Sequence, residues 1–204
     1  MNRSLAPTYE RFAARSKWIE DFVLRGNTLD ALSQRLVGEL AILYLAISME
    51  QSIEEICLRV CCGASYLDGS VPFLNKRCKS IENAADQLRV FGRQKKYINQ
   101  YMKWLNAVDI SGNVKHVIQV SDPIFKALAI HSETLDVVRI VRNHVAHRSK
   151  STRDQYRKEV QKIYGPISKA LEPGIFLMSP RLKPPLINSL IIRARVLIKD
   201  ITRG

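Results

Sequence analysis

The stretch from Thr28 to about Cys62 is the feature that most limits what this chain can fold into. Its apolar residues recur with the period of an α-helix, and from Leu40 to Met49 the helix is apolar nearly all round, with a single serine. Such a helix belongs in the middle of a bundle, where neighbours cover it on several sides. The apolar run is well short of the ~20 residues that span a bilayer, so the sequence predicts a buried core helix and no membrane partner.

Helical periodicity recurs along most of the remaining chain, so the predicted fold class is all-α. We expect an antiparallel four- to five-helix bundle over residues 1–172. Residues 173–204 are predicted as a proline-rich connector and an added C-terminal amphipathic helix from Leu186, which packs on the bundle or on a dimer partner. The other predicted helices are Pro7 to Arg25, Leu74 to Gly92, Lys95 to Leu105, Ser132 to His147, and one that Ser151 or Thr152 opens and Pro166 kinks.

Three side chains are predicted to cap helices. Thr28, Asp122 and Ser132 each stand just ahead of a periodic stretch and have the short polar side chain that an N-cap needs. Proline follows Asp122, which strengthens that assignment. Residues 108–120 are predicted as a loop or a short extended piece, since they contain Ser-Gly-Asn and then alternate like a strand without an obvious partner.

The net charge of the chain indicates which kinds of molecule it binds. It has 32 Lys and Arg against 19 Asp and Glu, a formal net charge of +13, so its field attracts polyanions. RNA, DNA and anionic membrane are the candidates, and the short apolar run argues against a membrane span. The N-terminus has no apolar segment ahead of a small-residue cleavage site, so we expect a cytoplasmic protein.

The cysteines do not predict a metal site or a disulfide framework. They lack a second, matching C-x2-C pair, and three of them lie on one predicted helix. We therefore expect reduced, partly buried thiols and neither a metal ion nor a cofactor. The four residues are Cys57, Cys61, Cys62 and Cys78.

The helix predicted from Ser132 to His147 carries the side chains with the most chemical content. Near its end Asn143 and His147 are stacked one turn apart, and the long Arg142 side chain lies at the border of the same polar face. One helix end therefore presents a cation, an amide and an imidazole together. The opposite, buried stripe consists of Leu135, Val138, Val141 and Val145.

These three groups suit cleavage of RNA by its own 2′-hydroxyl. The His147 imidazole can transfer protons near neutral pH, and the Arg142 guanidinium can bind a phosphate with two hydrogen bonds and neutralise its developing charge. Asn143 can hold the imidazole tautomer or a phosphate oxygen. No metal ion is needed for this reaction.

The segment from Arg142 to His147 resembles the signature of the HEPN superfamily: an arginine, a polar residue, a few variable positions and a histidine near a helix end. The resemblance covers roughly Thr28 to Leu171 and implies a four- or five-helix bundle. It implies a homodimer in which two motifs meet in a composite, metal-independent endoribonuclease site. It also implies Glu50, which follows the apolar run, as an acidic site residue.

The resemblance further implies a biological role. An endoribonuclease of this kind leaves 2′,3′-cyclic phosphate ends and acts as a toxin or phage-defence effector, restrained by an inhibitory protein partner or antitoxin. The alternative is a non-catalytic HEPN module that binds RNA, a nucleotide or a protein. A competing register of the motif, Arg139 with His144, has the same spacing but lacks the polar residue after the arginine.

Basic residues after the motif predict where RNA would bind. Between Arg142 and Lys169 there are eight Lys and Arg against two acids, enough to follow a phosphate backbone. The residues that we assign to RNA binding are Arg148, Lys150, Arg153 and Arg157. A second strip, Arg89 to Lys103, interleaves cations with aromatics and fits either RNA contact or an ordinary solvated helix face.

Overall fold

A computed structural model describes residues 4–91, 102–166 and 171–204, and this part of the chain confirms the all-α prediction. Apart from two isolated bridges, its regular secondary structure is helical. The helices are α1 (Ala6–Gly26), α2 (Ala31–Cys61), α3 (Ile81–Phe91), α4 (Ala107–Val114), α5 (Pro123–Ile130), α6 (Ser132–His147), α7 (Lys150–Tyr164), α8 (Pro173–Met178) and α9 (Leu186–Arg203).

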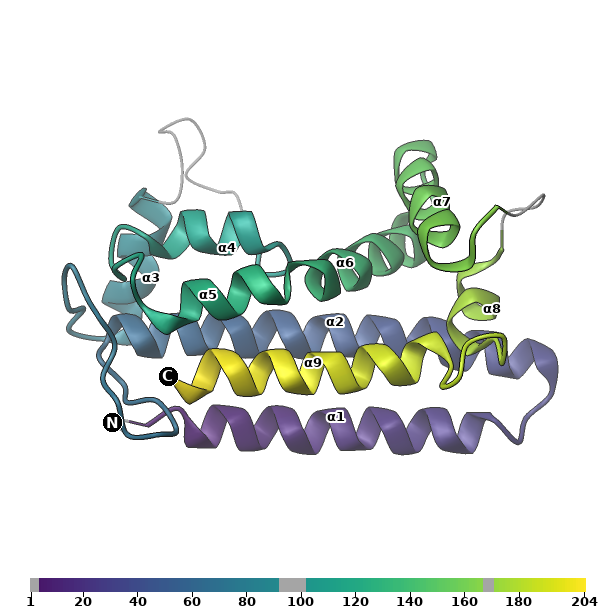
Figure 1. Cartoon of the computed structure of the whole chain (residues 1–204), viewed down its shortest axis with the longest axis horizontal. Helices are drawn as coiled ribbons and strands as arrows, with labels where there is room; N and C mark the ends of the chain where they lie inside the picture. The colour runs from purple at the N-terminus through teal and green to yellow at the C-terminus, as the bar shows by residue number, and fades with distance from the viewer. Residues whose placement is uncertain (1–3, 92–101, 167–170) are drawn as a thin grey trace.

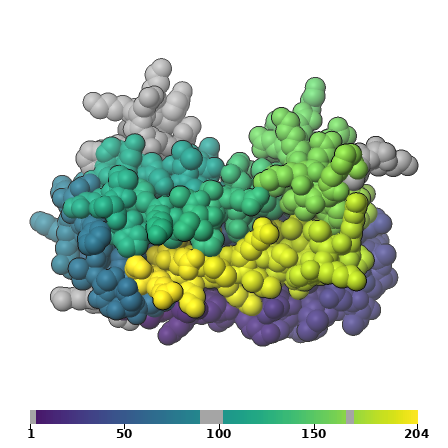
Figure 2. Space-filling view, viewed as in Figure 1, coloured from purple at the N-terminus to yellow at the C-terminus, as the bar shows by residue number. Residues whose placement is uncertain are grey.

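The three longest helices lie side by side and pack on one another (Figure 1). α1 runs antiparallel to α2 and α9, and α2 also contacts α3, α6 and α8. The shorter helices α4, α5 and α6 lie along one side of this layer. α7 stands out from the body next to the end of α6, and Figure 2 shows it as a projection.

α9, the predicted C-terminal amphipathic helix, packs on the bundle of its own chain. It contacts α1, α2, α5 and α6 of the same chain, and its apolar stripe is buried among them. The buried stripe is Ile187, Leu190, Ile191, Ala194, Leu197, Ile198 and Ile201, the set that the sequence periodicity picks out. Of the two predicted locations for this helix, the structure shows packing on its own bundle.

α2 is the core helix that the sequence predicts, but it is not covered on every side. Its buried positions include Ala41, Ile42, Leu45 and Ile53, whereas one strip of large apolar side chains stays exposed. Within the described residues α2 alone is long and apolar enough to cross a membrane by length and composition. Just over half of its most apolar window is buried inside the protein, as in the core helix of a globular bundle.

Two predicted N-caps are wrong. Asp30 rather than Thr28 caps α2, because its extended backbone lets Oδ1 accept hydrogen bonds from Leu32 N at 3.0 Å and Ser33 N at 3.1 Å. Thr28 instead donates its hydroxyl to Arg25 O at the end of α1. Ser132 is the first residue of α6, and the cap position before it is His131, which makes no side-chain capping bond.

The helix predicted from Leu74 begins only at Ile81. Residues 73–75 bond instead to the segment after α4: Gln119 N donates to Phe73 O at 2.8 Å, and Asn75 N donates to Val117 O at 2.9 Å. The alternating segment around Ile118 therefore has a partner, through the antiparallel bridge to Leu74. These pairings give the backbone N–H and C=O groups of this segment hydrogen bonds that a helix would otherwise provide.

Residues 107–114 form α4, where the sequence predicts a loop. Asn106 caps it by accepting a hydrogen bond from Asp109 N at 3.0 Å, and Gly112 is tolerated inside the helix. The helix predicted over Lys95 to Leu105 falls mostly outside the described residues, and residues 102–106 are not helical.

α7 also differs at both ends from its prediction. Ser149, two residues before the predicted start, caps it by accepting from Thr152 N. The helix ends at Tyr164 because Gly165 adopts φ +78, a conformation that favours glycine. Pro166 therefore lies beyond the helix instead of kinking it.

Asp122 is both the predicted cap of α5 and a buried junction. Its carboxylate accepts from Ile124 N at 3.1 Å, from Phe73 N at 2.8 Å and from the Tyr66 hydroxyl. Only 1% of Asp122 is exposed, so water does not replace its carboxylate, and the three donors depend on it as their hydrogen-bond acceptor. One side chain thus joins α5 to the loop between α2 and α3.

We predict that Asp122→Ala lowers the free energy of unfolding by roughly 3 kcal/mol, since it removes a cap and leaves buried donors without an acceptor. Chemical denaturation of the purified protein measures this. Asp30→Ala is the matched control: its cap is exposed, and we expect a loss of about 1 kcal/mol. Equal effects of the two variants would contradict the assigned role of Asp122.

Candidate functional site

The C-terminal half of α6 lies against α2 and carries the motif. Leu135, Val138 and Val141 are fully buried on the side that faces the bundle. α6 runs antiparallel to α2, because Arg142 pairs with Glu50 and Arg148, later in the chain, pairs with the earlier Glu39. The polar end of α6 is therefore held in register along the core helix.

The structure brings together Arg142, Asn143 and Glu50. Arg142 Nη1 donates to Asn143 Oδ1 at 3.0 Å, and Nη2 lies 3.4 Å from Glu50 Oε2. The Arg142 and Glu50 side chains are 28% and 33% exposed, so the pair is accessible from solvent. A guanidinium has five N–H donors, which leaves donors for an incoming phosphate.

The environment of Glu50 favours its neutral form. Burial raises the pKa of this carboxyl, the nearby Arg142 guanidinium lowers it, and Glu54 one turn away raises it; the net shift is upward. Glu50 is therefore a carboxyl whose charge is only partly compensated by its arginine.

His147 is the last residue of α6, and its side chain is exposed to solvent. No hydrogen bond or ion pair connects it to Arg142, Asn143 or Glu50 in the described part of the chain. One copy of the chain thus presents the arginine with its partners and the imidazole as neighbouring but separate groups on the same helix end.

His144 has a packing role, which separates the two possible registers of the motif. Its ring stacks on Tyr156 of α7 at 4.7 Å between centroids, and Nδ1 lies 3.4 Å from Thr152 Oγ1. Burial lowers its pKa, and the positive charges of Arg148 and Arg153 lower it further. In the competing register, Arg139 donates to Asp136 of its own helix at 2.8 Å. Of the two motif histidines, His144 is thus buried against α7 and His147 is exposed to solvent.

The residues assigned to RNA binding divide into two kinds. Arg148 donates to both oxygens of Glu39, at 3.0 and 2.8 Å, so its charge is partly engaged. Lys150, Arg153 and Arg157 lie on the exposed face of α7, whose other face buries Tyr156 and Val160. Of the second basic strip, residues 92–101 lie outside the described residues.

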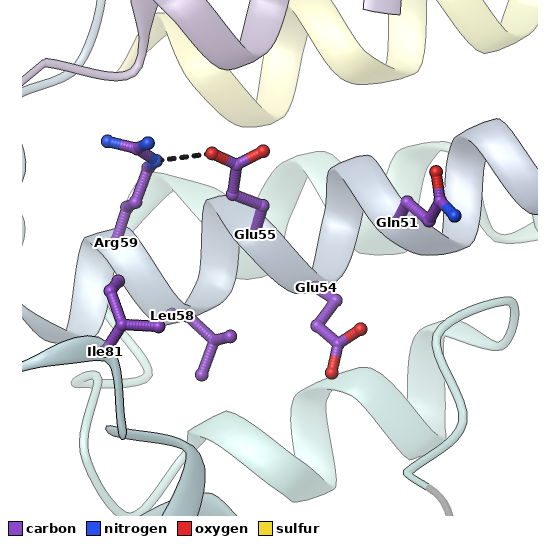
Figure 3. A pocket seen from close by; sticks show the side chains of 6 residues that line it. All are labelled: Gln51, Glu54, Glu55, Leu58, Arg59 and Ile81. Carbon is purple, nitrogen blue, oxygen red and sulfur yellow. Dashed lines mark hydrogen bonds and ion pairs between the residues drawn. The ribbon is translucent and has the colours of Figure 1, made fainter. Parts of the chain in front are cut away.

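A pocket of about 420 Å³ continues along α2 beyond Glu50 (Figure 3). Glu55 accepts hydrogen bonds there from Arg59 at 2.7 Å and Arg11 at 2.6 Å. Burial opposes ionisation of Glu55, but these two bonds outweigh it and lower its pKa. Glu54 points to the other side of α2 in the same view. Two carboxylates make this pocket a poor phosphate site. The lining residues are Gln51, Glu54, Glu55, Leu58, Arg59 and Ile81.

The described residues contain no cluster of three or more His, Cys, Asp or Glu side chains positioned to hold a metal ion. The four cysteines are free, and three are buried. Burial raises the pKa of the Cys57 and Cys61 thiols, which disfavours the thiolate form that attacks disulfides or binds metals.

Comparisons with protein-family models, with curated proteins and with solved structures found no match for this chain. The HEPN resemblance therefore rests on the motif and its place on α6.

Sequence reasoning missed Glu39, which holds Arg148, and Tyr156, which holds His144. A signal for Glu39 was present: Glu39 and Glu50 are eleven residues apart, three helical turns, and so lie on one side of α2. Nothing in the sequence indicated the stacking partner of His144, because that contact depends on the direction in which α7 leaves α6.

We predict that Glu50→Gln raises the thermal stability of the protein at pH 7. A carboxyl with a raised folded-state pKa contributes stability that is complete below its unfolded value, near 4.5, and is lost as the pH rises through the folded value. The amide mimics the neutral form, so the difference in melting temperature from the wild type should vanish at about pH 4 and grow toward pH 7.

Glu20→Gln is the matched control for this experiment. Glu20 is similarly exposed, but a hydrogen bond from Arg195 lowers its pKa despite the opposing effect of burial. That variant should lower the melting temperature at pH 7, and the difference should shrink as the pH falls. Loss of stability in both variants at pH 7 would contradict the environment assigned to Glu50.

Proposed function

We propose that this protein is a metal-independent endoribonuclease that cleaves RNA to 2′,3′-cyclic phosphate ends. The observation that carries the proposal is the end of α6, where a guanidinium with free donors, an amide and an exposed imidazole lie beside the exposed basic face of α7. This combination supplies phosphate binding and proton transfer without a metal ion. The net charge of +13 favours a polyanionic substrate.

Each residue has a distinct role in this proposal. His147 exchanges the proton of the 2′-hydroxyl or of the leaving 5′-oxygen, and Arg142 binds the phosphate and stabilises its added negative charge. Asn143 and Glu50 are positioning residues, because each holds the guanidinium through a direct contact. Lys150, Arg153 and Arg157 bind the phosphates that follow along the strand.

The role of a toxin or phage-defence effector belongs to the same proposal. A metal-independent RNase needs no metal supply in order to act on cellular RNA, so this role includes an inhibitory protein partner or antitoxin that restrains it. The cytoplasm, where cellular RNA is found, is the location that this role requires.

A non-catalytic RNA-binding module is the second candidate. It is favoured by the pairing of Arg142 with Glu50 and by the lack of contact between Arg142 and His147 within one copy. RNA binding without cleavage under any condition would select this alternative.

We predict that the purified protein cleaves single-stranded RNA in excess EDTA and that His147→Ala and Arg142→Ala each lose roughly 100- to 10,000-fold in turnover. Gel analysis with mapping of the 3′ ends measures both rate and chemistry. Arg142→Ala should lose far more turnover than RNA affinity.

His116→Ala and Arg193→Ala are the controls: both side chains are exposed, and they belong to the segment after α4 and to α9 rather than to the end of α6. Their activity should equal that of the wild type. Cleavage that survives in His147→Ala at the wild-type rate would point to a contaminating nuclease or to a different base.

We also predict that RNA affinity depends steeply on salt through the exposed face of α7. For single strands, log K falls by ~0.7 per log unit of salt for each phosphate neutralised. Arg153→Ala with Arg157→Ala should therefore flatten the slope by about 1.4 and weaken binding to all sequences alike. Arg193→Ala with Lys199→Ala, on α9, is the charge-matched control and should leave the slope unchanged. A changed sequence preference with an unchanged slope would contradict this assignment.

A further inference from the structure

Cations and aromatic rings alternate along one face of α1, next to α2. Successive members are four, three, four and three residues apart, the spacing that places side chains on one face of a helix. The contact with α2 is direct: Arg15 Nη1 donates to Gln51 Oε1 at 2.7 Å, and the Trp18 ring touches the Tyr44 ring. We call this face the α1 strip: Arg11, Arg15, Trp18, Phe22 and Arg25.

Trp18 is half exposed, which is unusual for the largest of the apolar side chains. Its ring is nevertheless held in place. The Phe22 ring lies parallel to it at 5.8 Å between centroids, and the Tyr44 ring meets it edge-on at 5.4 Å. Tyr44 is itself 45% exposed. Two exposed rings of fixed orientation therefore stand where α1 meets α2, and a planar ligand can stack on them with little loss of side-chain entropy.

The cations of the α1 strip indicate the charge of that ligand. Arg15 donates to the neutral amide of Gln51, and Arg25 donates to a backbone carbonyl at 3.3 Å. In the described part of the chain neither arginine forms an ion pair with a carboxylate, so both keep an uncompensated charge. At 1.5 Å per residue they lie about 15 Å apart along α1, with Trp18 between them. This arrangement suits a ligand with a planar group between negative charges.

We propose that Trp18 and Tyr44 form a platform on which unpaired bases of a single-stranded nucleic acid stack. Arg15 and Arg25 bind the phosphates on either side of it. Aromatic rings between cations hold a single strand without reading its sequence, because every base has a flat face. In a duplex the bases are stacked on one another and are not free to stack on the rings. The ligand is therefore a strand with unpaired bases.

The place of the platform relative to α6 gives it a role in substrate recognition, which rests on the proposed function. α6 and α1 lie on opposite sides of α2 in Figure 1. Tyr44 precedes Glu50, the residue that contacts Arg142, by six positions, or about 9 Å along α2. Ile47 lies between them and is 44% exposed. A strand bound at Arg142 can thus cross α2 over Ile47 and place a base, a few nucleotides away, on the platform.

Tryptophan fluorescence tests the stacking directly. The chain has two tryptophans, and the other one, Trp104, is buried. We expect a single-stranded oligothymidylate of about 12 nucleotides to quench the emission of Trp18, because a stacked base contacts its ring. This DNA lacks the 2′-hydroxyl, so it reports binding whether or not the protein is an RNase. A DNA duplex should not quench. Quenching that survives in Trp18→Leu, or equal quenching by the duplex, overturns the proposal.

Affinity for the same oligothymidylate tests each ring. Trp18→Leu and Tyr44→Leu should each weaken binding roughly 5- to 150-fold, the effect of losing one base–aromatic stack. Tyr44→Phe keeps the ring and should bind like the wild type, and circular dichroism checks that each variant keeps its helices. Leu32→Ala is the matched control, since Leu32 is 66% exposed on α2 but carries no ring. An equal loss in Leu32→Ala would indicate a protein or lipid that covers the whole apolar strip of α2 and would overturn the proposal.

The salt dependence of the same binding tests the cations. Arg15→Ala with Arg25→Ala should flatten the slope of log K against log salt by about 1.4, because two phosphate contacts are lost. Arg11→Ala with Lys17→Ala is the charge-matched control on α1. Each of these two cations is already paired with a carboxylate, so the slope should hardly change. Equal slopes in the two double variants contradict the phosphate contacts.

Steady-state kinetics test the link to cleavage. For a single-stranded RNA of about 12 nucleotides, Trp18→Leu should raise KM and leave kcat unchanged, because the platform binds substrate and transition state equally. A dinucleotide is too short to reach from Arg142 to the platform and should be cleaved as by the wild type. An equal loss with the dinucleotide overturns the recognition role. A protein that is quenched by the oligothymidylate but cleaves no RNA refutes the proposed function and not the platform. RNase activity without quenching does the reverse.

Discussion

Burial of α2 is the constraint on which the rest of the structure depends. α1, α9, α6 and α8 each bury apolar surface by packing on it, and α3 contacts its far end. The same helix supplies Glu39 and Glu50, the two carboxylates that hold α6 in register. The position of the candidate site is therefore set by the core helix and not by the loops around it. A change that shifted α2 along its axis would displace Arg142 and Arg148 together.

The sequence predicted the long helices well because their periodicity extends over many turns. α1, α2, α6 and α9 fall within a few residues of their predicted ranges. It failed where tertiary contacts override a short local pattern. Leu74 has helical spacing with Ile81, but its neighbours bond to residues 117–119. The opposite error occurs at α4, where the residues that resemble a loop are stabilised as a helix by Asn106 and by burial of Ile110.

In the candidate site, too, some features follow from the sequence and others only from the packing of the helices. Periodicity placed Arg142, Asn143 and His147 on one helix end, and the HEPN resemblance singled out Glu50, which the structure places against Arg142. The engagement of Arg148 by Glu39 was not predicted, because it depends on how α6 crosses α2. The strip of large apolar side chains that stays exposed on α2 was also missed. A helix that is apolar all round predicts burial, but sequence alone does not say whether a neighbour from the same chain or from another supplies it.

The backbone and the side-chain contact of Arg148 favour different residues at this position. It adopts φ +45, the left-handed conformation that ends α6 and turns the chain into α7, and glycine would adopt it with less strain. Its guanidinium, however, holds both oxygens of Glu39. Glycine would relax the turn and release the side-chain anchor, while a large apolar residue would keep the strain without the anchor. Loss of the Glu39 carboxylate would therefore leave Arg148 with the strained turn and without the contact that offsets it.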